Sequence, residues 1–149
     1  MARVRLDLPR QFEFSTEIRV RISDINYGGH LGNDAILSLI HEARLRFLNK
    51  NGFTESNIDG SGLIMVDSVI VYKSQGLYGE ILSIEVATDN FSKHGCDFIY
   101  RITKKETGRE IARAKTGVVF FDYEKKRMVR VPERFRAMTA SKQSENSPI

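Results

Sequence analysis

Apolar and polar side chains alternate along the first part of the chain. Between positions 12 and 23, each apolar residue or Thr is followed by a charged residue or Ser, beginning with Phe12-Glu13 and ending with Ile22-Ser23. Successive side chains of a β-strand point to opposite faces of the sheet. A two-residue period over this length therefore predicts a strand with one face buried and the other exposed.

The period changes to that of a helix over positions 33–50. The apolar residues recur three or four positions apart and so share one helical face: Ile36, Leu39, Ile40, Ala43 and Phe47. Gly32 or Asn33 can cap the start of this helix, and Asn51-Gly52 is a signal for its end. Three leucines lie off the apolar stripe, which indicates that more than one side of the helix is covered: Leu37, Leu45 and Leu48.

Four strand-like runs follow a loop rich in Asn, Asp and Gly: 63–72, 81–91, 96–104 and 110–123. Turn signals between consecutive runs predict that neighbouring runs form antiparallel hairpins: Gln75-Gly76, His94-Gly95 and Glu106-Thr107-Gly108. A short helix is predicted at 132–138, where Pro132 suits a helix start. This order of elements favours an α+β fold in which an antiparallel five-stranded sheet wraps around one long central helix.

The chain has the composition of a single folded domain. Its 149 residues are 41% hydrophobic and 28% charged, enough apolar material for one core, and we place this domain at residues 1–138. Residues 139–149 are polar and rich in Ser without periodicity, so we expect a disordered tail there. The longest apolar runs are too short to span a bilayer, and no membrane association is expected.

Charge and cysteine content narrow the partners and the compartment. The net charge of +4 suits an anionic ligand, but the basic residues are dispersed, so no nucleic-acid partner is expected. We interpret Lys104-Lys105 and Lys125-Lys126-Arg127 as exposed hairpin tips, with phosphate binding as the alternative. The single cysteine, Cys96, excludes an intrachain disulfide and a Cys-rich zinc site and fits a reducing, cytoplasmic location.

The segment between the first strand and the helix is the best candidate for chemistry. Positions 23–33 combine polar side chains with three glycines, Gly28, Gly29 and Gly32. Glycines let the backbone approach a ligand closely, and a helix start offers unpaired N–H groups to an oxygen that carries negative charge. The segment therefore predicts an oxyanion site.

Positions 24–33, DINYGGHLGN, together with the order of elements, resemble the hotdog-fold thioesterases, in particular the 4-hydroxybenzoyl-CoA thioesterase-like acyl-CoA hydrolases and more distantly plant acyl-carrier-protein thioesterases. The motif of that family reads roughly D-x-D-x-x-G-H-V-N-N. Asn26 stands in place of its second Asp, and Gly32 in place of its first Asn. The matched motif positions are Asp24, Gly29, His30 and Asn33. Further matches extend the resemblance over residues 12–135, at Tyr72, Gly79-Glu80 and Val131-Pro132.

The resemblance implies a homodimer or tetramer with active sites at the dimer interface. It also implies hydrolysis of an acyl-CoA or acyl-carrier-protein thioester without a metal or other cofactor. In the family, the carboxylate at the position of Asn26 is the usual nucleophile or general base. An amide cannot accept a proton from water at neutral pH, so Asn26 is left to donate a hydrogen bond to the thioester carbonyl or to hold a water molecule. Another residue must then supply the base.

Four carboxylates are candidates for that role. Asp24 ends the first strand, beside the glycine-rich segment. Glu42 lies at the margin of the helical stripe, where another branch of hotdog thioesterases carries its carboxylate, with an ion pair to Arg46 as the alternative. Asp67 interrupts a very apolar run, and the resemblance allows it to reach the motif loop of a neighbouring protomer. Asp34 is better explained by its interaction with the helix dipole.

The histidines offer one further candidate. His30 matches the Gly-His pair of the family motif and is predicted to shape the site, with structural packing as the alternative. His41 and His94 are interpreted as structural. No pair of histidines has metal-ligand spacing, so no metal site is expected.

We therefore interpret the chain as an acyl-CoA thioesterase in which Asn26, Gly29 and His30 act at the carbonyl, with the base supplied by one of the carboxylates. The residues assigned to substrate binding are Gly28, Gly29, Gly32 and Asn33. Two alternatives keep the fold. One is a non-hydrolytic acyl-CoA or acyl-carrier-binding protein, suggested by the missing Asp at position 26, and the other is a hydroxyacyl-thioester dehydratase.

Overall fold

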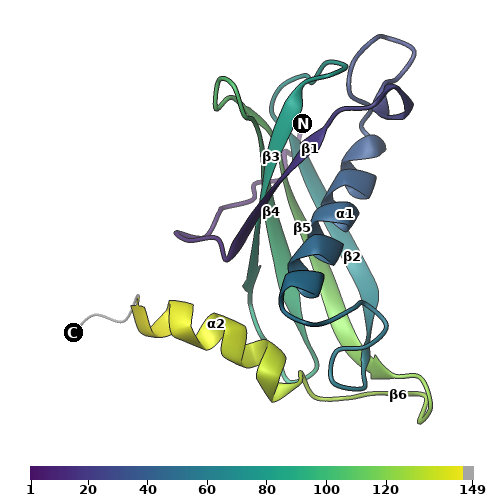
Figure 1. Cartoon of the computed structure of the whole chain (residues 1–149), viewed down its shortest axis with the longest axis vertical. Coiled ribbons are helices and arrows are strands. Elements are labelled where there is room, and N and C mark those ends of the chain that lie inside the picture. Colours follow the sequence, from purple (N-terminus) through teal and green to yellow (C-terminus); the bar gives the residue numbers. More distant parts are fainter. Residues whose placement is uncertain (146–149) are drawn as a thin grey trace.

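The computed structural model describes the backbone of residues 1–145 and the side chains of residues 1–139. The centre of the protein is an antiparallel sheet with the strand order β1-β3-β4-β5-β2 (Figure 1). A two-residue strand, β6, also pairs with β5. The strands are β1 (Phe14–Arg19), β2 (Gly62–Tyr72), β3 (Ile81–Asp89), β4 (Gly95–Lys104), β5 (Glu110–Asp122) and β6 (Arg127–Met128). The five predicted strands are confirmed, and β6 is an addition that the sequence did not indicate.

Helix α1 (Ala35–Lys50) lies against one face of this sheet (Figure 1). The predicted apolar stripe is its buried face, and Phe47 shows why: its ring lies 5.7 Å from that of Phe14 on β1 and 6.2 Å from that of Phe98 on β4. Full burial of such a side chain contributes about 2–3 kcal/mol to folding. The helix is therefore held by the sheet rather than by its own propensity.

Both ends of α1 have identifiable causes. The helix ends at Asn51, whose side-chain amide donates to the Phe47 carbonyl at 2.9 Å, and Gly52 follows with a φ of +80° that favours glycine. The predicted stop signal is thus confirmed. At the other end the residue before the helix is Asp34, one position later than predicted, and its side chain makes no capping hydrogen bond. It can act there only through its charge near the helix dipole.

The connection between β2 and β3 differs from the predicted hairpin. β2 lies at the edge of the sheet beside β5, so β4 and β5 separate it from β3, and the hairpin prediction at Gln75-Gly76 is wrong. The turn signal marks a local bend in a connection that crosses the end of the sheet, where the Gly76 carbonyl accepts from the Leu31 N–H at 2.8 Å. The predicted hairpins at the other two turn signals, which join β3 to β4 and β4 to β5, are confirmed.

Helix α2 (Glu133–Glu145) covers one end of the core (Figure 1). Phe135 is fully buried there, with four other rings at centroid distances of 5.1–6.2 Å, namely Phe53, Phe91, Phe98 and Phe120. The helix continues to Glu145, so the structure differs from the expected disorder at positions 139–145. Residues 146–149 lie outside the described residues, and the assignment of one domain to 1–138 stays a prediction. No helix among the described residues is long and apolar enough to cross a membrane.

Candidate functional site

The loop between β1 and α1 is folded around the side chain of Asn26. The Asn26 Oδ1 accepts from the backbone N–H of Gly28 at 3.0 Å and from that of His30 at 3.2 Å, and the Asn26 N–H donates to the His30 carbonyl at 2.8 Å. Gly29 has a φ of +84° and donates its N–H to the Asn26 carbonyl at 3.0 Å. Asn26 therefore fixes the shape of the loop through its oxygen.

This arrangement changes which N–H groups are available to a ligand. The predicted donors of the glycine-rich segment are already used within the protein, because Gly28, Gly29 and His30 donate to Asn26 and Gly32 donates to the Asp24 carbonyl at 2.9 Å. Among the described residues, the backbone N–H groups of Asn33 and Asp34 make no hydrogen bond. Nor does the side-chain NH₂ of Asn26. An oxyanion is therefore best received at the N-terminal end of α1.

Asp24 holds the base of the loop. Its carboxylate is 4% exposed and accepts three hydrogen bonds from Arg21, one from the backbone N–H at 2.8 Å and two from the guanidinium at 3.2 and 3.3 Å. The hydrogen bond to Asp24 is also the main reason that the pKa of Arg21 is raised. Burial and full hydrogen bonding suit Asp24 to a structural role and leave it poorly placed to take a proton from water.

A small pocket borders the loop and the end of β2. Its volume is about 230 Å³, and its wall includes Leu31, Asn33, Ile36, Tyr72, Gly76 and Ile111. The Tyr72 hydroxyl donates to the Asn33 carbonyl at 3.3 Å and so joins β2 to the start of α1. Of the loop residues assigned to catalysis or substrate binding from the sequence, only Asn33 lines this pocket.

Glu42 makes the ion pair that was weighed as the alternative to a catalytic role. Its carboxylate lies 3.0 Å from Nε of Arg46 and is 49% exposed. Arg46 also donates to the Thr16 hydroxyl and the Glu17 carbonyl, both at 2.9 Å, and so ties α1 to β1. Glu42 therefore faces the β1 side of the helix, and the structure does not bring it to the loop around Asn26.

Asp67 lies on β2, the edge strand of the sheet, and 57% of its side chain is exposed. A hydrogen bond from Lys115 at 2.7 Å, with a second from the Gly117 N–H at 3.0 Å, keeps the pKa of Asp67 below its usual value. Along the strand, Asp67 is about 17 Å from Tyr72, where β2 meets the loop. Within one chain, Asp67 and the loop around Asn26 are therefore separate.

A polar network that sequence reasoning missed lies under the second half of α1. Arg44 is 5% exposed; its Nε donates to Glu55 at 2.7 Å and its Nη1 to the Tyr100 hydroxyl at 3.0 Å. Tyr100 is in turn 2.9 Å from the Thr116 hydroxyl, and the second oxygen of Glu55 lies 3.0 Å from Nε2 of His41. The network joins α1, the loop after it, β4 and β5.

Burial and hydrogen bonding act against each other on the ionisable groups of this network. Burial alone would raise the pKa of Glu55, but hydrogen bonds from Arg44 and His41 outweigh it and the pKa is lowered. Burial would lower the pKa of Arg44, whereas Tyr100 and Glu55 raise it above its usual value. Burial raises the pKa of Tyr100. Glu55 and Arg44 are therefore both charged at neutral pH.

One signal for this network was present in the sequence. Arg44 stands four residues after Ile40 and four before Leu48, both buried, so the helical period places it on the edge of the apolar face. Its partners, at positions 55, 100 and 116, carried no pattern that would connect them.

A second pocket, larger than the one beside the loop, lies away from it. It has a volume of about 1050 Å³ and lies at the end of the molecule formed by β6 and the start of α2, with Lys93, Arg127, Arg130 and Arg134 in its wall. Arg127 from the predicted basic hairpin tip thus borders a cavity. No group of three or more His, Cys, Asp or Glu side chains suited to a metal ion occurs in the described part of the chain.

Comparison with known proteins gives a consistent result for family and fold. The thioesterase-like superfamily matches residues 20–138, whereas no curated protein matches the chain. A 1,4-dihydroxy-2-naphthoyl-CoA thioesterase from Synechocystis is similar with a TM-score of 0.78 and 22% identity, over 85% of this chain and 95% of that one. The DHNA-CoA thioesterase of Staphylococcus aureus is similar with a TM-score of 0.77 and 17% identity, over 91% of this chain and 95% of that one. A thioesterase-superfamily protein from Jannaschia is similar with a TM-score of 0.81 and 20% identity, over 91% of this chain and 86% of that one. The expected hotdog fold is thereby confirmed.

Proposed function

Since the chain belongs to the thioesterase-like superfamily, we propose that it is an acyl-CoA thioesterase that hydrolyses a thioester to a free acid and the CoA thiol. The observation that carries this proposal is the loop around Asn26, which presents the start of α1 and its unpaired N–H groups beside a pocket. Thioester hydrolysis needs donors for the oxygen that becomes negative, and a thiolate leaves with little help from an acid.

Asn26, Gly29 and His30 have complementary roles in this proposal. Asn26 Oδ1 holds the loop, which leaves its NH₂ group to orient a thioester carbonyl or a water molecule. Gly29 provides the left-handed backbone that the turn requires, and His30 anchors the turn through its N–H and its carbonyl. The glycines thus act on substrate binding through the shape of the loop.

A homodimer formed by β2 is part of the proposal, with a tetramer as a further step of assembly. β2 is eleven residues long and lies at the sheet edge, where Met65 and Val66 are exposed at 39% and 58%. A long edge strand with exposed apolar side chains favours pairing with another chain. Two identical strands related by a two-fold axis pair antiparallel, which would bring the start of one β2 to the end of the other. Analytical ultracentrifugation tests this state.

The activity is tested by thiol release from short, long and aromatic acyl-CoA thioesters in the presence of a colorimetric thiol reagent. Aromatic substrates belong in the panel because two similar structures are named as thioesterases of an aromatic acyl-CoA. Cys96 is 4% exposed and burial raises the pKa of its thiol, so the folded protein adds little background to the assay. Turnover of at least one thioester supports the proposal, and none across the panel contradicts it.

The carboxylates predicted from sequence enter the same assay as Glu42→Gln, Asp67→Asn and Asp24→Asn. We expect Glu42→Gln to keep its activity because its carboxylate is paired with Arg46 on the β1 side of the helix. Asp67→Asn tests whether this carboxylate, which is bonded to Lys115 and Gly117 of β5, reaches the loop of a second copy. Asp24→Asn tests the loop itself, because its carboxylate holds the loop in place.

A non-hydrolytic acyl-CoA-binding protein is the second candidate function. The observation that favours it is the amide at position 26, whose oxygen is occupied by two backbone N–H groups. Binding of an acyl-CoA by isothermal titration calorimetry, together with no thiol release, would replace the thioesterase by this candidate. An acyl-carrier protein as thioester donor, and a cytoplasmic location, stay proposals alongside either function.

A further inference from the structure

His41 is held at the surface of α1 by a carboxylate. Its Nε2 lies 3.0 Å from Oε2 of Glu55, and 51% of its side chain is exposed. Glu55 comes from the loop after α1, so the contact joins two separate segments of the chain. The ring is thus fixed in orientation while remaining accessible to a reactant.

Glu55 is itself held in place by the buried guanidinium of Arg44. Arg44 donates to its other oxygen at 2.7 Å, is 5% exposed, and is anchored by Tyr100 and Thr116 through hydrogen bonds of 3.0 and 2.9 Å. A buried guanidinium is costly unless it is paired. Here its hydrogen bonds create a continuous support from the sheet to the exposed ring of His41. Such supporting contacts are what hold a reactive side chain in one geometry.

The partner of Nε2 determines which ring nitrogen is free. An ionised Glu55 carboxylate only accepts hydrogen bonds, so Nε2 of the neutral ring carries the hydrogen and Nδ1 carries the lone pair. Within the described residues, Nδ1 of His41 makes no hydrogen bond. The charged groups that line the open surface around the ring are Glu17, Arg19, Arg21, Glu42 and Arg46, with Glu55 on its other side. None of them is bonded to the ring except Glu55.

We propose that His41 is the general base of the hydrolysis, with Glu55 as its positioning residue; this rests on the proposed thioesterase function. As a water oxygen attacks the thioester carbonyl carbon, Nδ1 takes the proton of that water. The C–S bond then breaks, the thiolate leaves, and the imidazolium returns the proton to sulfur. The products are the carboxylic acid and the CoA thiol, and His41 is restored. The base that Asn26 cannot provide is thus supplied from the helix.

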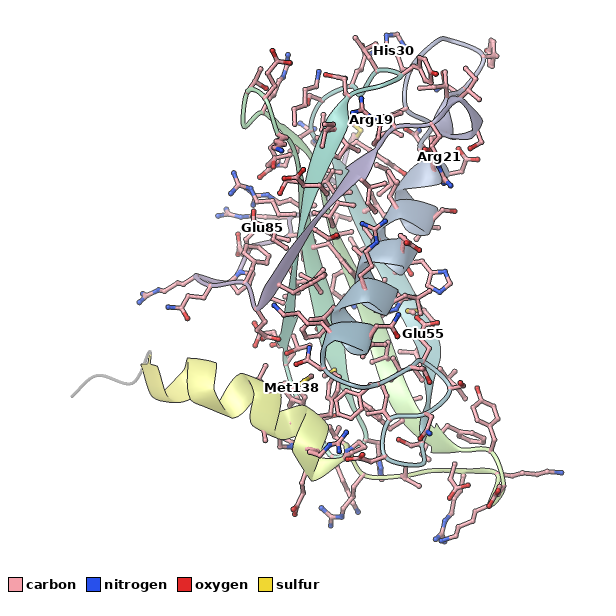
Figure 2. The ribbon with its side chains drawn as sticks, in the orientation of Figure 1. Arg19, Arg21, His30, Glu55, Glu85 and Met138 are labelled. Carbon is pink, nitrogen blue, oxygen red and sulfur yellow. The ribbon has the colours of Figure 1, made fainter. Side chains whose placement is uncertain are left out.

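The separation of His41 from the loop makes the site a shared one. His41 lies about two helical turns, or about 10 Å, beyond the start of α1. Figure 2 shows His30 of the loop and Glu55 toward opposite ends of this helix. A base and an oxyanion site that act on one carbonyl must both lie within hydrogen-bond reach of it. His41 of one subunit therefore serves the Asn26 loop of the partner.

The first test compares His41→Gln and Glu55→Gln with wild type in kcat and KM on an acyl-CoA that the protein cleaves. Loss of a general base lowers kcat about 10²–10⁴-fold, and we expect KM to change little. His94→Gln is the matched control, because His94 bonds the backbone carbonyl of Val129 and borders a different pocket from the one that His41 lines.

The outcomes separate the inference from the proposed function. If wild type cleaves no thioester, the proposed function fails. If wild type is active and His41→Gln keeps its kcat, the inference alone is overturned. His41 is exposed, so its variant should fold, and an unchanged melting temperature confirms this. Glu55→Gln should lower kcat less than His41→Gln, since it removes only the support of the base.

The second test mixes two inactive variants, His41→Gln and Asn26→Ala, and lets their subunits exchange. If each site takes His41 from one chain and the loop from the other, a mixed dimer contains one intact site. Random pairing then restores roughly a quarter of the wild-type rate, because half of the dimers are mixed and each has one of its two sites intact. No recovery among verified mixed dimers, or full activity of Asn26→Ala alone, overturns the shared site.

Discussion

Two polar regions border α1, and they differ in how far apart in the sequence their hydrogen-bonded residues lie. The loop before the helix spans positions 24–33, and most of its hydrogen bonds join neighbours in the sequence. The network beneath the second half of α1 joins Arg44 to residues that lie 11, 56 and 72 positions further along the chain, the last through Tyr100. In the loop, the Asn26 side chain bonds the backbone of its own segment, whereas the network ends at the exposed ring of His41, whose Nδ1 makes no hydrogen bond within the described residues.

This difference shows how the chain can compensate for the amide at position 26. The loop uses the Asn26 oxygen to keep its shape and leaves donors but no base. The network holds a base, His41, but no oxyanion site. Each region supplies what the other lacks, which is the reason we infer that two subunits contribute to one site.

Breaking the network at its buried cation has the largest expected effect. Arg44→Met removes the hydrogen bonds that Arg44 donates to the Glu55 carboxylate and the Tyr100 hydroxyl, and we expect the free energy of unfolding to fall by about 3 kcal/mol. Urea denaturation followed by circular dichroism measures it. Tyr100→Phe removes a hydroxyl but keeps the ring and should cost only about 1–2 kcal/mol. A loss under about 0.5 kcal/mol for Arg44→Met would show that the network is not stabilising.

Breaking the loop at its buried carboxylate should have the next largest effect. Asp24→Asn places an NH₂ group where the carboxylate accepts three hydrogen bonds from Arg21, and we expect a loss of about 2 kcal/mol. Asp34→Asn is the matched control, since Asp34 makes no capping hydrogen bond and should change stability by less than about 0.5 kcal/mol. Equal losses in the two variants would contradict the assignment of Asp24 as the anchor of the loop.

Two substitutions at position 26 separate the shape of the loop from its chemistry. Asn26→Ala removes the acceptor for two backbone N–H groups, and we expect a loss of about 1 kcal/mol and a large drop in kcat. Asn26→Asp keeps that acceptor and should keep stability within about 0.5 kcal/mol. Thermal unfolding measures the first quantity and thiol release the second. A loop that loses no stability in Asn26→Ala would show that the two hydrogen bonds do not hold it.

Acid provides the mildest way to weaken the network. The pKa of Glu55 is lowered from 4.5 in the folded chain, so its contribution to stability is complete above that value and is lost as the pH falls through the lower folded pKa. The difference in unfolding free energy between wild type and Glu55→Gln should therefore shrink below about pH 4.5. Denaturant titrations at several pH values measure this. Glu42→Gln, at an exposed ion pair, should differ from wild type by no more than about 0.5 kcal/mol, and a constant difference for Glu55→Gln would contradict the prediction.

Features set by near neighbours along the chain could be predicted from the sequence alone. The two-residue period predicted β1, the helical period predicted the buried face of α1, and Asn51-Gly52 predicted its end, because strand and helix geometry repeat within a few residues. The segment at 24–33 also carried the family resemblance. Each of these signals is complete within about a dozen residues, so no knowledge of the tertiary fold is needed to find it.

The contacts between distant segments could not be predicted in this way and are set by the folded chain. The turn at Gln75-Gly76 has the chemistry of a hairpin, yet β2 pairs with β5, because strand pairing depends on the packing of whole faces and not on the turn alone. The partners of Arg44 could not be found for the same reason, since Glu55, Tyr100 and Thr116 share no period with it. Folding also determined that the Asn26 oxygen is used by the backbone and that a free histidine nitrogen lies about two helical turns beyond the start of α1.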